Sequence, residues 1–300
     1  MDNTVSNKQH RAGFVNIIGN PNVGKSTLMN ALVGENLSIV TAKAQTTRHR
    51  IMGIVNGEDY QIVYSDTPGI LKPNYRLQKN MMNFVDTAIG DADIILYVTD
   101  VVEKADKNSE YIAKLQKLDC PVVVVVNKID LSDQEKVTSL MAKWKENLPE
   151  AVIIPVSAKE KFNLQSVMDT IVGYLPVSPA WFDKDAFTDK NLRFFASEII
   201  RENILLNYNE EVPYCCEVEV ESFKEGEERY DISAVINVMR DSQKVILIVK
   251  GGSALKRLGT KSRIEMEDFF QKKVFLSLYV RVDENWRESR KELRKFGYEQ

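Results

Sequence analysis

The 300-residue sequence is poor in the residues on which disulfide frameworks and zinc sites depend. Its three cysteines are Cys120, Cys215 and Cys216, and an odd count with two adjacent members does not make a disulfide framework. With only His10 and His49 in the chain, a histidine-based zinc site is nearly excluded. This cysteine usage fits a reducing compartment, so we expect a cytoplasmic protein.

Long apolar runs are also missing. The longest, such as residues 122–126 and 151–156, reach at most about a third of the length of a membrane span, so we expect no transmembrane helix. The first residues, Met1-Asp-Asn-Thr, show no basic region followed by an apolar one, so we expect no secretory signal there. The net charge of -3 argues against a protein that is basic all over and binds nucleic acid through its whole surface, but it does not exclude a local basic patch.

The first half of the sequence alternates short apolar runs with amphipathic segments. The runs are dense in Val and Ile and do not alternate with polar residues, which is typical of strands buried on both faces. Strands are predicted over 14–19, 61–65, 94–100, 122–127 and 152–156, and helices over 25–33, 78–89, 108–118, 133–147 and 164–174. The alternation predicts an α/β domain over residues 11–175 with a mostly parallel sheet.

The second half has a different pattern. Residues 176–190 contain Pro176 and Pro179 and show no periodicity, so they are predicted to be a linker. A smaller α+β domain is then expected over 191–299. It comprises a helix from Leu192, a hairpin of 214–223 and 228–239, a helix after Gly259, a strand over 274–282 and a last helix over 286–296 that ends at Gly297.

A phosphate-binding motif follows the first predicted strand. Gly19-Asn-Pro-Asn-Val-Gly24-Lys25-Ser26 matches G-x-x-x-x-G-K-[ST] and opens a predicted helix, which is the context that this motif requires. The glycines let backbone N–H groups surround phosphate oxygens at a helix N-terminus. We expect Lys25 to reach the β- and γ-phosphates and the Ser26 hydroxyl to bind Mg²⁺.

Two further segments are expected to sense the γ-phosphate. Asp66-Thr-Pro-Gly69 ends a predicted strand, where the carboxylate can hold Mg²⁺ and the Gly69 N–H can meet the γ-phosphate. The polar loop Gln45-Thr46-Thr47-Arg48-His49 offers Thr47 as another ligand of Mg²⁺ and the γ-phosphate. An ordinary turn and a solvated loop are the alternative interpretations of these two segments.

Asn127-Lys128-Ile-Asp130 follows a Val-rich strand and predicts guanine specificity. A carboxylate at Asp130 can accept hydrogen bonds from guanine N1–H and the 2-amino group together, and adenine lacks both donors. Asn127 and Lys128 would support the base and the phosphate loop, and Ser157-Ala158, after the next strand, would bring a backbone N–H to guanine O6.

These segments define the predicted site for GTP or GDP with Mg²⁺. The catalytic candidates are Lys25, Thr47 and Gly69, and the metal candidates are Ser26, Thr47 and Asp66. The nucleotide-binding candidates are Gly19, Asn20, Pro21, Asn22, Val23, Gly24, Lys25, Ser26, Thr27, Asp66, Thr67, Pro68, Gly69, Ile70, Asn127, Lys128, Asp130, Ser157 and Ala158.

This set of motifs resembles the TrmE-Era-EngA-like class of translation-factor-related GTPases. The tail is similar to that of the Era family, the bacterial ribosome-assembly GTPases, and the resemblance runs from about residue 11 to 298. It rests on Thr188-Asp-x-x-x-Arg193-Phe-x-x-x-Glu198-x-x-Arg201-Glu, Ser242-Gln-Lys, the stretch 250–259 and Trp286-x7-Arg294-x-x-Gly297-Tyr298.

The resemblance implies a GTPase domain followed by a type II KH domain that binds the 3′ region of 16S rRNA during maturation of the 30S subunit. It also implies peripheral association with the inner face of the cell membrane. A monomer is expected. The alternative is an Era-like GTPase that acts on another RNA or on a protein partner such as a tRNA-modification enzyme. A P-loop ATPase or kinase would lack the Asn127-Lys128-x-Asp130 motif.

A local excess of basic residues supports an RNA partner. Residues 242–264 carry six basic side chains and no acidic one, although a solvated helical face is the alternative interpretation. The candidates for RNA binding are Lys244, Lys250, Gly251, Gly252, Lys256, Arg257, Lys261 and Arg263. Val249-Lys250-Gly251-Gly252 stands where KH domains have G-x-x-G, so Val249 replaces the first glycine and either the loop tolerates it or its backbone contact changes.

Two residues bear on the rate of hydrolysis. Ile70 stands where Ras-like proteins carry a water-orienting Gln, so slow intrinsic hydrolysis is expected. Related P-loops with Pro-Asn-x-Gly-Lys bind K⁺ through the Asn, which is Asn22 here. A loop-stabilising Asx turn is the alternative role for Asn22.

Overall fold

The computed structural model describes residues 9–103 and 109–299, and the chain folds as two compact units. The first unit takes most of the chain up to Asp189. The second starts at Lys190 and also includes two segments from the first half, Ile39–Thr46 and Lys72–Met81. The first four residues, assessed above for a signal, and Asn108, the predicted start of a helix, lie outside the described residues.

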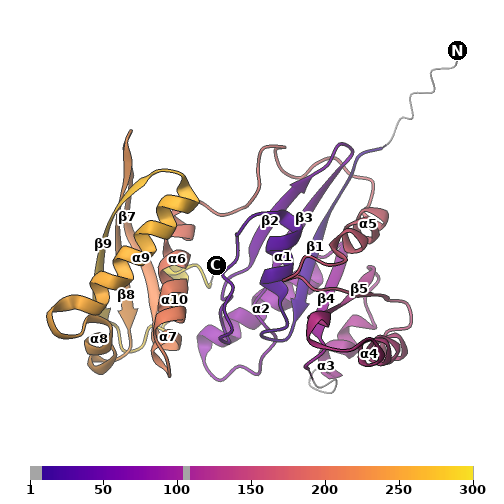
Figure 1. Ribbon diagram of the computed structural model, residues 1–300, viewed down its shortest axis with the longest axis horizontal. Coiled ribbons are helices and arrows are strands. Elements are labelled where there is room, and N and C mark those ends of the chain that lie inside the picture. Colours follow the sequence, from indigo (N-terminus) through magenta and orange to yellow (C-terminus); the bar gives the residue numbers. More distant parts are fainter. Residues whose placement is uncertain (1–8, 104–108, 300) are drawn as a thin grey trace, which may run out of the picture. The chain divides into compact units, whose positions relative to one another are not determined.

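The first unit is built on a six-stranded sheet in the order β2-β3-β1-β4-β5-β6 (Figure 1). Strand β2 is antiparallel to β3, and the other neighbours are parallel, as the strand–helix alternation predicts. All seven residues of β4 are buried, which requires cover on both faces of the sheet. The strands are β1 (Arg11–Gly19), β2 (Ile51–Asn56), β3 (Tyr60–Asp66), β4 (Ile94–Asp100), β5 (Val122–Asn127) and β6 (Val152–Pro155).

The helices of the first unit lie close to their predicted positions. Helices α1 and α5 have the predicted bounds, and α2 begins two residues earlier than predicted because the pattern misses its first polar turn. The helices are α1 (Lys25–Val33), α2 (Arg76–Gly90), α3 (Ser109–Leu115), α4 (Gln134–Asn147) and α5 (Leu164–Tyr174), with a short 3₁₀ turn, η1 (Ile129–Leu131). The start of α2, as far as Met81, falls in the second unit.

The predicted linker is attached to the first unit. The backbone N–H groups of Trp181 and Phe182 donate to Gln61 Oε1 in β3, and Thr188 pairs with Gly53 of β2. The stretch up to Asp189 therefore follows the strands of the first unit although it forms no regular element of its own.

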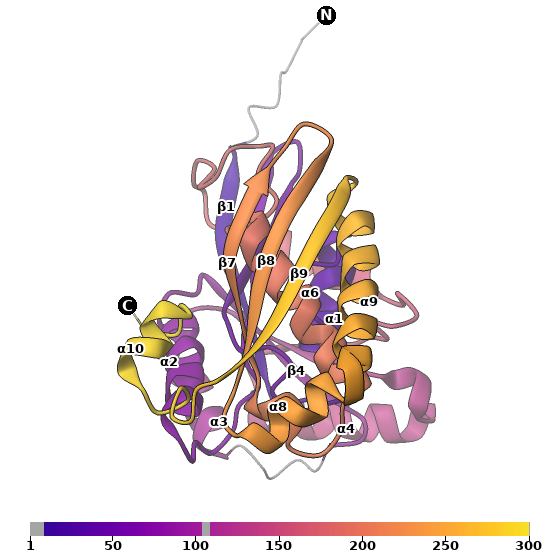
Figure 2. The same ribbon diagram turned by 90° about the vertical axis from the view of Figure 1, so that its left-hand side faces the viewer.

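The second unit is a three-stranded sheet in the order β7-β8-β9 with helices packed on it (Figure 2). Strands β7 and β8 form the antiparallel hairpin predicted from sequence, although residues 214 and 215 are helical and do not belong to its first strand. Strand β9 is parallel to β8. Its elements are α6 (Leu192–Asn207), α7 (Val212–Cys215), β7 (Glu217–Glu225), β8 (Arg229–Val238), α8 (Asp241–Ile248), η2 (Lys250–Gly252), α9 (Ser253–Phe270), β9 (Lys273–Val282) and α10 (Arg290–Lys295).

Two helix predictions in this unit are wrong. Helix α9 begins at Ser253, so Gly259 lies inside it and does not precede it. A Cβ on Gly259 would meet Leu278 of β9 at 3.4 Å, an ordinary contact distance, so this face of the helix packs on the strand. The last helix is shorter than predicted and begins at Arg290. Gly297 follows it with a φ of 80°, as expected of a residue that ends a helix.

The core of the second unit lies between the helices and one face of the sheet. Its buried members include Ile200 and Ile204 of α6, Leu258 of α9 and Ile236 of β8. Among the described residues, no helix is both long enough and apolar enough to cross a lipid bilayer.

Candidate functional site

The phosphate loop joins the end of β1 to the start of α1, as the sequence predicts. Gly24 has a φ of 95°, and a Cβ there would lie 2.3 Å from the Asn127 side-chain nitrogen. A Cβ on Gly19 would lie 2.2 Å from the Val98 carbonyl oxygen. Only glycine fits at either position. Because neither residue has a side chain, the backbone groups of the phosphate loop line the site at these points.

Lys25 is buried at the start of α1, and its Nζ donates a hydrogen bond to the Asn20 carbonyl oxygen at 2.8 Å. Burial lowers the pKa of Lys25 to about 8, although the charges of Asp66 and Glu103 act in the opposite direction. The acceptor of this hydrogen bond is a neutral carbonyl group. An anion such as a phosphate would therefore stabilise the charged form of the buried amine.

Three oxygen-bearing side chains of the first unit meet beside Lys25. Ser26 Oγ lies 2.6 Å from Asp66 Oδ2 and 2.9 Å from Thr47 Oγ1, and Thr47 Oγ1 lies 3.3 Å from Asp66 Oδ2. Asp66 Oδ1 is buried without a hydrogen bond, and burial raises the pKa of this carboxyl group. Hard oxygen donors of this kind suit Mg²⁺, so the three predicted metal residues fit the ion.

The segment after Asp66 is held against the phosphate loop. Thr67 Oγ1 donates to the Ile17 carbonyl oxygen at 2.7 Å, and the Ile70 N–H donates to the Gly19 carbonyl oxygen at 3.0 Å. A Cβ on Gly69 would lie 2.7 Å from the backbone of Pro21, so this position also requires glycine. The side chain of Ile70 is buried.

The residues predicted to bind the base lie together at the carboxyl ends of β5 and β6. Asn127 Nδ2 donates to the Val23 carbonyl oxygen at 2.9 Å, and Asn127 Oδ1 accepts from the Ala158 N–H at 3.0 Å. Asp130 accepts a hydrogen bond of 2.6 Å from Ser157 Oγ. The structure therefore joins Asn127 to the phosphate loop and Asp130 to the segment after β6.

Sequence reasoning missed Asp100, the last residue of β4. Lys128 Nζ donates to Asp100 Oδ2 at 2.6 Å and to the Asn22 carbonyl oxygen at 2.5 Å, so Asp100 anchors a lysine that spans the phosphate loop. A signal was present, because a carboxylate at the carboxyl end of a parallel strand lies at the edge where ligands bind.

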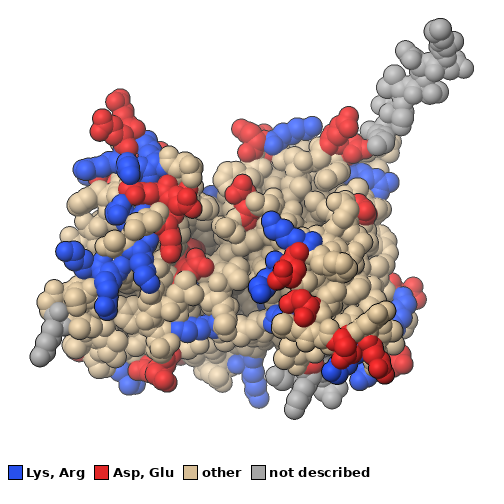
Figure 3. Space-filling model, viewed as in Figure 1, with Lys and Arg blue, Asp and Glu red and all other residues tan. Residues whose placement is uncertain are grey.

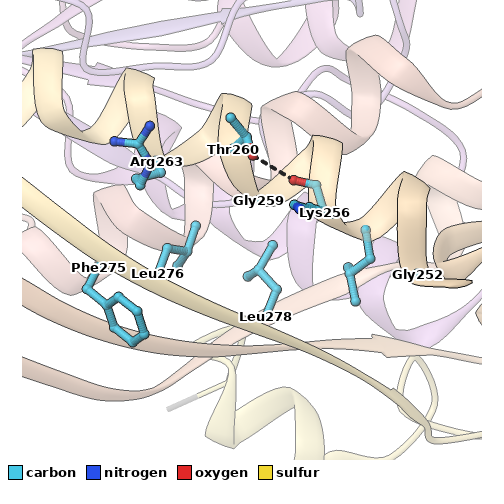
Figure 4. A pocket seen from close by; sticks show the side chains of 9 residues that line it. Gly252, Lys256, Gly259, Thr260, Arg263, Phe275, Leu276 and Leu278 are labelled. Carbon is cyan, nitrogen blue, oxygen red and sulfur yellow. Dashed lines mark hydrogen bonds between the residues drawn. The ribbon is translucent and has the colours of Figure 1, made fainter.

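The basic strip predicted in the second half borders a hollow on the second unit. The hollow has a volume of about 430 Å³ and lies between α9 and β9 (Figure 4). Helix α9 contributes Lys256 and Arg263, and β9 contributes Phe275, Leu276 and Leu278. Figure 3 shows basic side chains along α9 and acidic ones at the tip of the β7–β8 hairpin.

The candidates for RNA binding differ in their surroundings. Lys256 and Arg257 are exposed, and neither has an ion pair among the described residues. Lys261 donates to Asn207 Oδ1 at 2.5 Å, and Arg263 pairs with Glu267 at 2.7 Å. Lys244 is half-buried on α8, and the side chain of Lys250 lies outside the described part.

The loop between α8 and α9 keeps a glycine-like backbone despite Val249. Val249 has a φ of 57°, Gly251 one of 69° and Gly252 one of 72°. A β-branched residue rarely adopts a positive φ, so the backbone at Val249 is strained. A Cβ on Gly251 or Gly252 would meet no atom within 4 Å, which leaves both open to a ligand.

Among the described residues, no group of three or more His, Cys, Asp or Glu side chains forms a metal cluster. This does not bear on the site of Ser26, Thr47 and Asp66, in which two of the three donors are hydroxyl groups.

Comparisons with known proteins agree with this geometry. Residues 14–128 match the family model of the 50S ribosome-binding GTPases, and residues 211–287 match that of the KH domain. GTPase Era of Geobacter sp. strain M21 is 44% identical, with 98% of this chain and 100% of the relative aligned. A chloroplastic ERA-like GTPase of rice is 42% identical, over 96% of this chain and 70% of the relative.

Two solved structures have the same fold along nearly the whole chain. A variant of Aquifex aeolicus Era bound to GDP.AlF4⁻ aligns with a TM-score of 0.92 and 37% identity, covering 97% of this chain and 100% of that one. Era in complex with MgGDPNP and nucleotides 1506–1542 of 16S ribosomal RNA aligns with the same values.

Fold, site and family models together define a P-loop GTPase domain followed by a KH domain, and the chain hydrolyses GTP. The extent of the similarity is more specific than either domain alone. The chain belongs to the Era family of GTPases, which confirms the resemblance found in the sequence.

Proposed function

We propose that this chain is a GTP-driven switch that binds the 3′ region of 16S rRNA and acts in maturation of the 30S ribosomal subunit. The observation that carries the proposal is that one chain brings the predicted nucleotide-binding residues together and also has a hollow bordered by basic residues in its KH domain. The Era structure solved with 16S RNA, 37% identical to this chain, supports the choice of RNA. The proposed site of action is the cytoplasm, with peripheral contact to the inner face of the cell membrane, and the proposed state is a monomer.

The residues of the first unit have separate roles in the proposed cycle. Lys25 binds the β- and γ-phosphates, and Asp130 selects guanine. Thr47 and Gly69 close on the γ-phosphate and are released after hydrolysis. Mg²⁺ held by Ser26, Thr47 and Asp66 would neutralise charge on the phosphates. The buried side chain of Ile70 cannot orient water, which supports a slow intrinsic rate.

The role of Asn22 in this rate is open to a direct test. Asn22 is exposed in the phosphate loop with a φ of 64°, a conformation that Asn tolerates better than most residues. If Asn22 also binds K⁺, hydrolysis is expected to be faster in K⁺ than in Na⁺ buffer, and Asn22→Ala is expected to remove the difference. Equal rates of phosphate release in the two buffers for the unsubstituted protein would contradict the K⁺ proposal.

The hollow of the second unit suits single-stranded RNA. Its floor is apolar, with Leu276 and Leu278 of β9, and its helical wall carries Lys256 and Arg263. Apolar and aromatic groups bind unstacked bases, and lysine and arginine bind the phosphates between them. The open sides of Gly251 and Gly252 allow a close approach of the nucleic-acid backbone.

Replacing both Lys256 and Arg257 by alanine is expected to weaken RNA binding and to flatten its salt dependence. Each phosphate contact on a single strand contributes about 0.7 to the slope of log affinity against log salt, so the slope is expected to fall by about 1.4. The measurement is a titration of a 16S 3′ oligonucleotide at several salt concentrations.

The matched control for this prediction is the double substitution Lys136→Ala and Lys143→Ala. Both lysines are exposed on α4 of the first unit, and their loss changes the net charge by the same amount. An unchanged salt slope in the Lys256 and Arg257 variant, or an equal change in the control, would contradict the assignment of the hollow.

The alternative partner is another RNA or an enzyme of tRNA modification. The reason to keep this alternative is Val249, which stands where KH domains have the first glycine of G-x-x-G, although its φ of 57° is glycine-like. Competition between the 16S oligonucleotide and tRNA for the same protein distinguishes the two. Preference for tRNA would overturn the choice of 16S rRNA.

A further inference from the structure

Two charged residues of the tail motif, Glu198 and Arg201, are buried in the second unit. Glu198 is 6% exposed and Arg201 is 1% exposed. Arg201 Nε donates to Glu198 Oε1 at 2.7 Å, and a terminal nitrogen of Arg201 donates to Glu198 Oε2 at 2.6 Å. Burying such a pair is costly and often adds no stability over apolar residues, so its presence calls for a further role.

The same nitrogen of Arg201 also donates to the backbone carbonyl oxygen of Thr46 at 2.5 Å. Thr46 ends the segment Ile39–Thr46, which belongs to the second unit together with α6. The forked contact with Glu198 fixes the plane of the guanidinium group, and the group in turn fixes the Thr46 carbonyl.

One face of α6 binds the rest of this segment. Lys43 Nζ donates to the carbonyl oxygens of Leu205, at 2.5 Å, and of Tyr208, at the end of the helix. Desolvation raises the pKa of Glu202 overall, although a hydrogen bond from the backbone of Val40 acts to lower it. Residues 198, 201, 202 and 205 are spaced by three, one and three, so they lie on one side of the helix.

Thr47, the predicted ligand of Mg²⁺ and the γ-phosphate, is the next residue in the chain after Thr46. The Thr46 carbonyl and the Thr47 nitrogen belong to one planar peptide group, so a restraint on the carbonyl oxygen restrains the backbone from which Thr47 projects. Thr47 Oγ1 contacts Ser26 and Asp66 in the candidate Mg²⁺ site. A misplacement of a ligand by about 1 Å is enough to lower a rate markedly.

We propose that Arg201, oriented by Glu198, is a positioning residue that sets Thr47 for Mg²⁺ and the γ-phosphate. The proposal rests on the proposed role of Thr47. It assigns a function to the Glu198-x-x-Arg201 part of the tail, which neither the nucleotide site nor the basic hollow uses. Helix α6 thereby acts on the affinity for the triphosphate and leaves the affinity for the diphosphate unchanged.

The test replaces the pair as a unit, Glu198→Leu with Arg201→Met, because removing one member alone would leave a buried charge without its partner. Affinities for GDP and for GDPNP with Mg²⁺ are measured in the full chain, with single-turnover hydrolysis. We expect GDPNP affinity and the hydrolysis rate each to fall about tenfold, as for loss of one charge-assisted hydrogen bond, with GDP affinity unchanged. Arg201→Lys keeps a donor and is expected to recover part of the loss.

The matched control is Glu221→Leu with Arg281→Met, an ion pair of 2.5 Å on the exposed sheet surface of the same unit. It removes the same two charges and is expected to change neither affinity. Thermal melts check that both variants fold. Hydrogen exchange of residues 39–48 is expected to rise in the Glu198 and Arg201 variant only, with that of β8 unchanged.

Thr47→Ala separates failure of this proposal from failure of the proposed function. If Thr47→Ala lowers the affinity for GDPNP and the Glu198→Leu, Arg201→Met variant does not, the positioning role is overturned and the role of Thr47 stands. If Thr47→Ala has no effect, the proposed role of Thr47 fails. If the pair variant unfolds, faster exchange of residues 39–48 in the folded Arg201→Lys protein decides the question, and unchanged exchange there overturns the positioning role.

Discussion

Replacing Asp130 by asparagine is expected to lower the affinity for GTP by about 10³-fold and to raise that for xanthosine triphosphate. Two hydrogen bonds to the charged group are worth about 1.5–3 kcal/mol each, and an amide cannot accept from both N1–H and the 2-amino group of guanine. Xanthine has a carbonyl in place of the 2-amino group, and the asparagine amide can donate to it. The measurement is competition of GTP, xanthosine triphosphate and ATP against a fluorescent guanine nucleotide.

The structure offers a close control for this change. The side-chain oxygen of the introduced asparagine can still accept the hydrogen bond from Ser157, so the segment after β6 is expected to stay in place. Asp133→Asn makes the same substitution at an exposed helix cap, where asparagine caps as well as aspartate does. Unaltered discrimination between GTP and xanthosine triphosphate in Asp130→Asn would contradict the assignment of the base site.

Replacing Lys25 by methionine is expected to lower the affinity for GTP and GDP by about 10²-fold or more, because charge-assisted bonds to the phosphates are lost. The nucleotide-free protein is expected to keep its stability or to gain some, because methionine fills a similar volume without a buried amine. Nucleotide titration and thermal melts without nucleotide provide the two measurements. If the free energy of unfolding of the nucleotide-free Lys25→Met protein fell by as much as the free energy of nucleotide binding, Lys25 would have a structural role.

The pH dependence of stability gives a second test of Lys25. Its pKa is about 8 in the folded chain and 10.5 ordinarily, so between these values the unfolded chain binds more protons. Stability of the nucleotide-free protein is therefore expected to rise with pH over this window, by up to about 3 kcal/mol relative to Lys25→Met. Denaturant unfolding at pH 7 and pH 10 measures it, and Lys143→Met, an exposed change on α4, is the control.

Much of the first unit was predictable because its motifs are local. The phosphate loop, the Asp66 turn and the Asn127 segment each follow a buried strand, so their convergence at one edge of a parallel sheet follows from topology. The hydrogen bonds from Ser26 to Asp66 and from Asn127 to the Val23 carbonyl show that the three segments meet, although the roles of these residues stay predictions.

Features that depend on contacts distant in sequence were not predictable. Strand β2 is an exception, because its partner β3 is the next element in the chain; it was missed because Gly53 interrupts its apolar residues. The start of α9 at Ser253 was missed because Gly259, a residue that usually interrupts helices, lies inside the helix. Asp100 and Arg201 were missed as contacts because their partners lie 28 and 155 residues away.

The membership of Ile39–Thr46 and Lys72–Met81 in the second unit has a consequence for cutting or recombining the gene. Leu77 donates its N–H to the Arg287 carbonyl oxygen, and Arg76 pairs with Glu299 at 2.7 Å. A fragment that stops at Asp189 would leave both segments without the contacts that hold them. A chimaera that exchanges the second unit between relatives would have to exchange these two segments together with the chain from Lys190 onward. The part that must be exchanged as a whole is therefore larger than that continuous stretch.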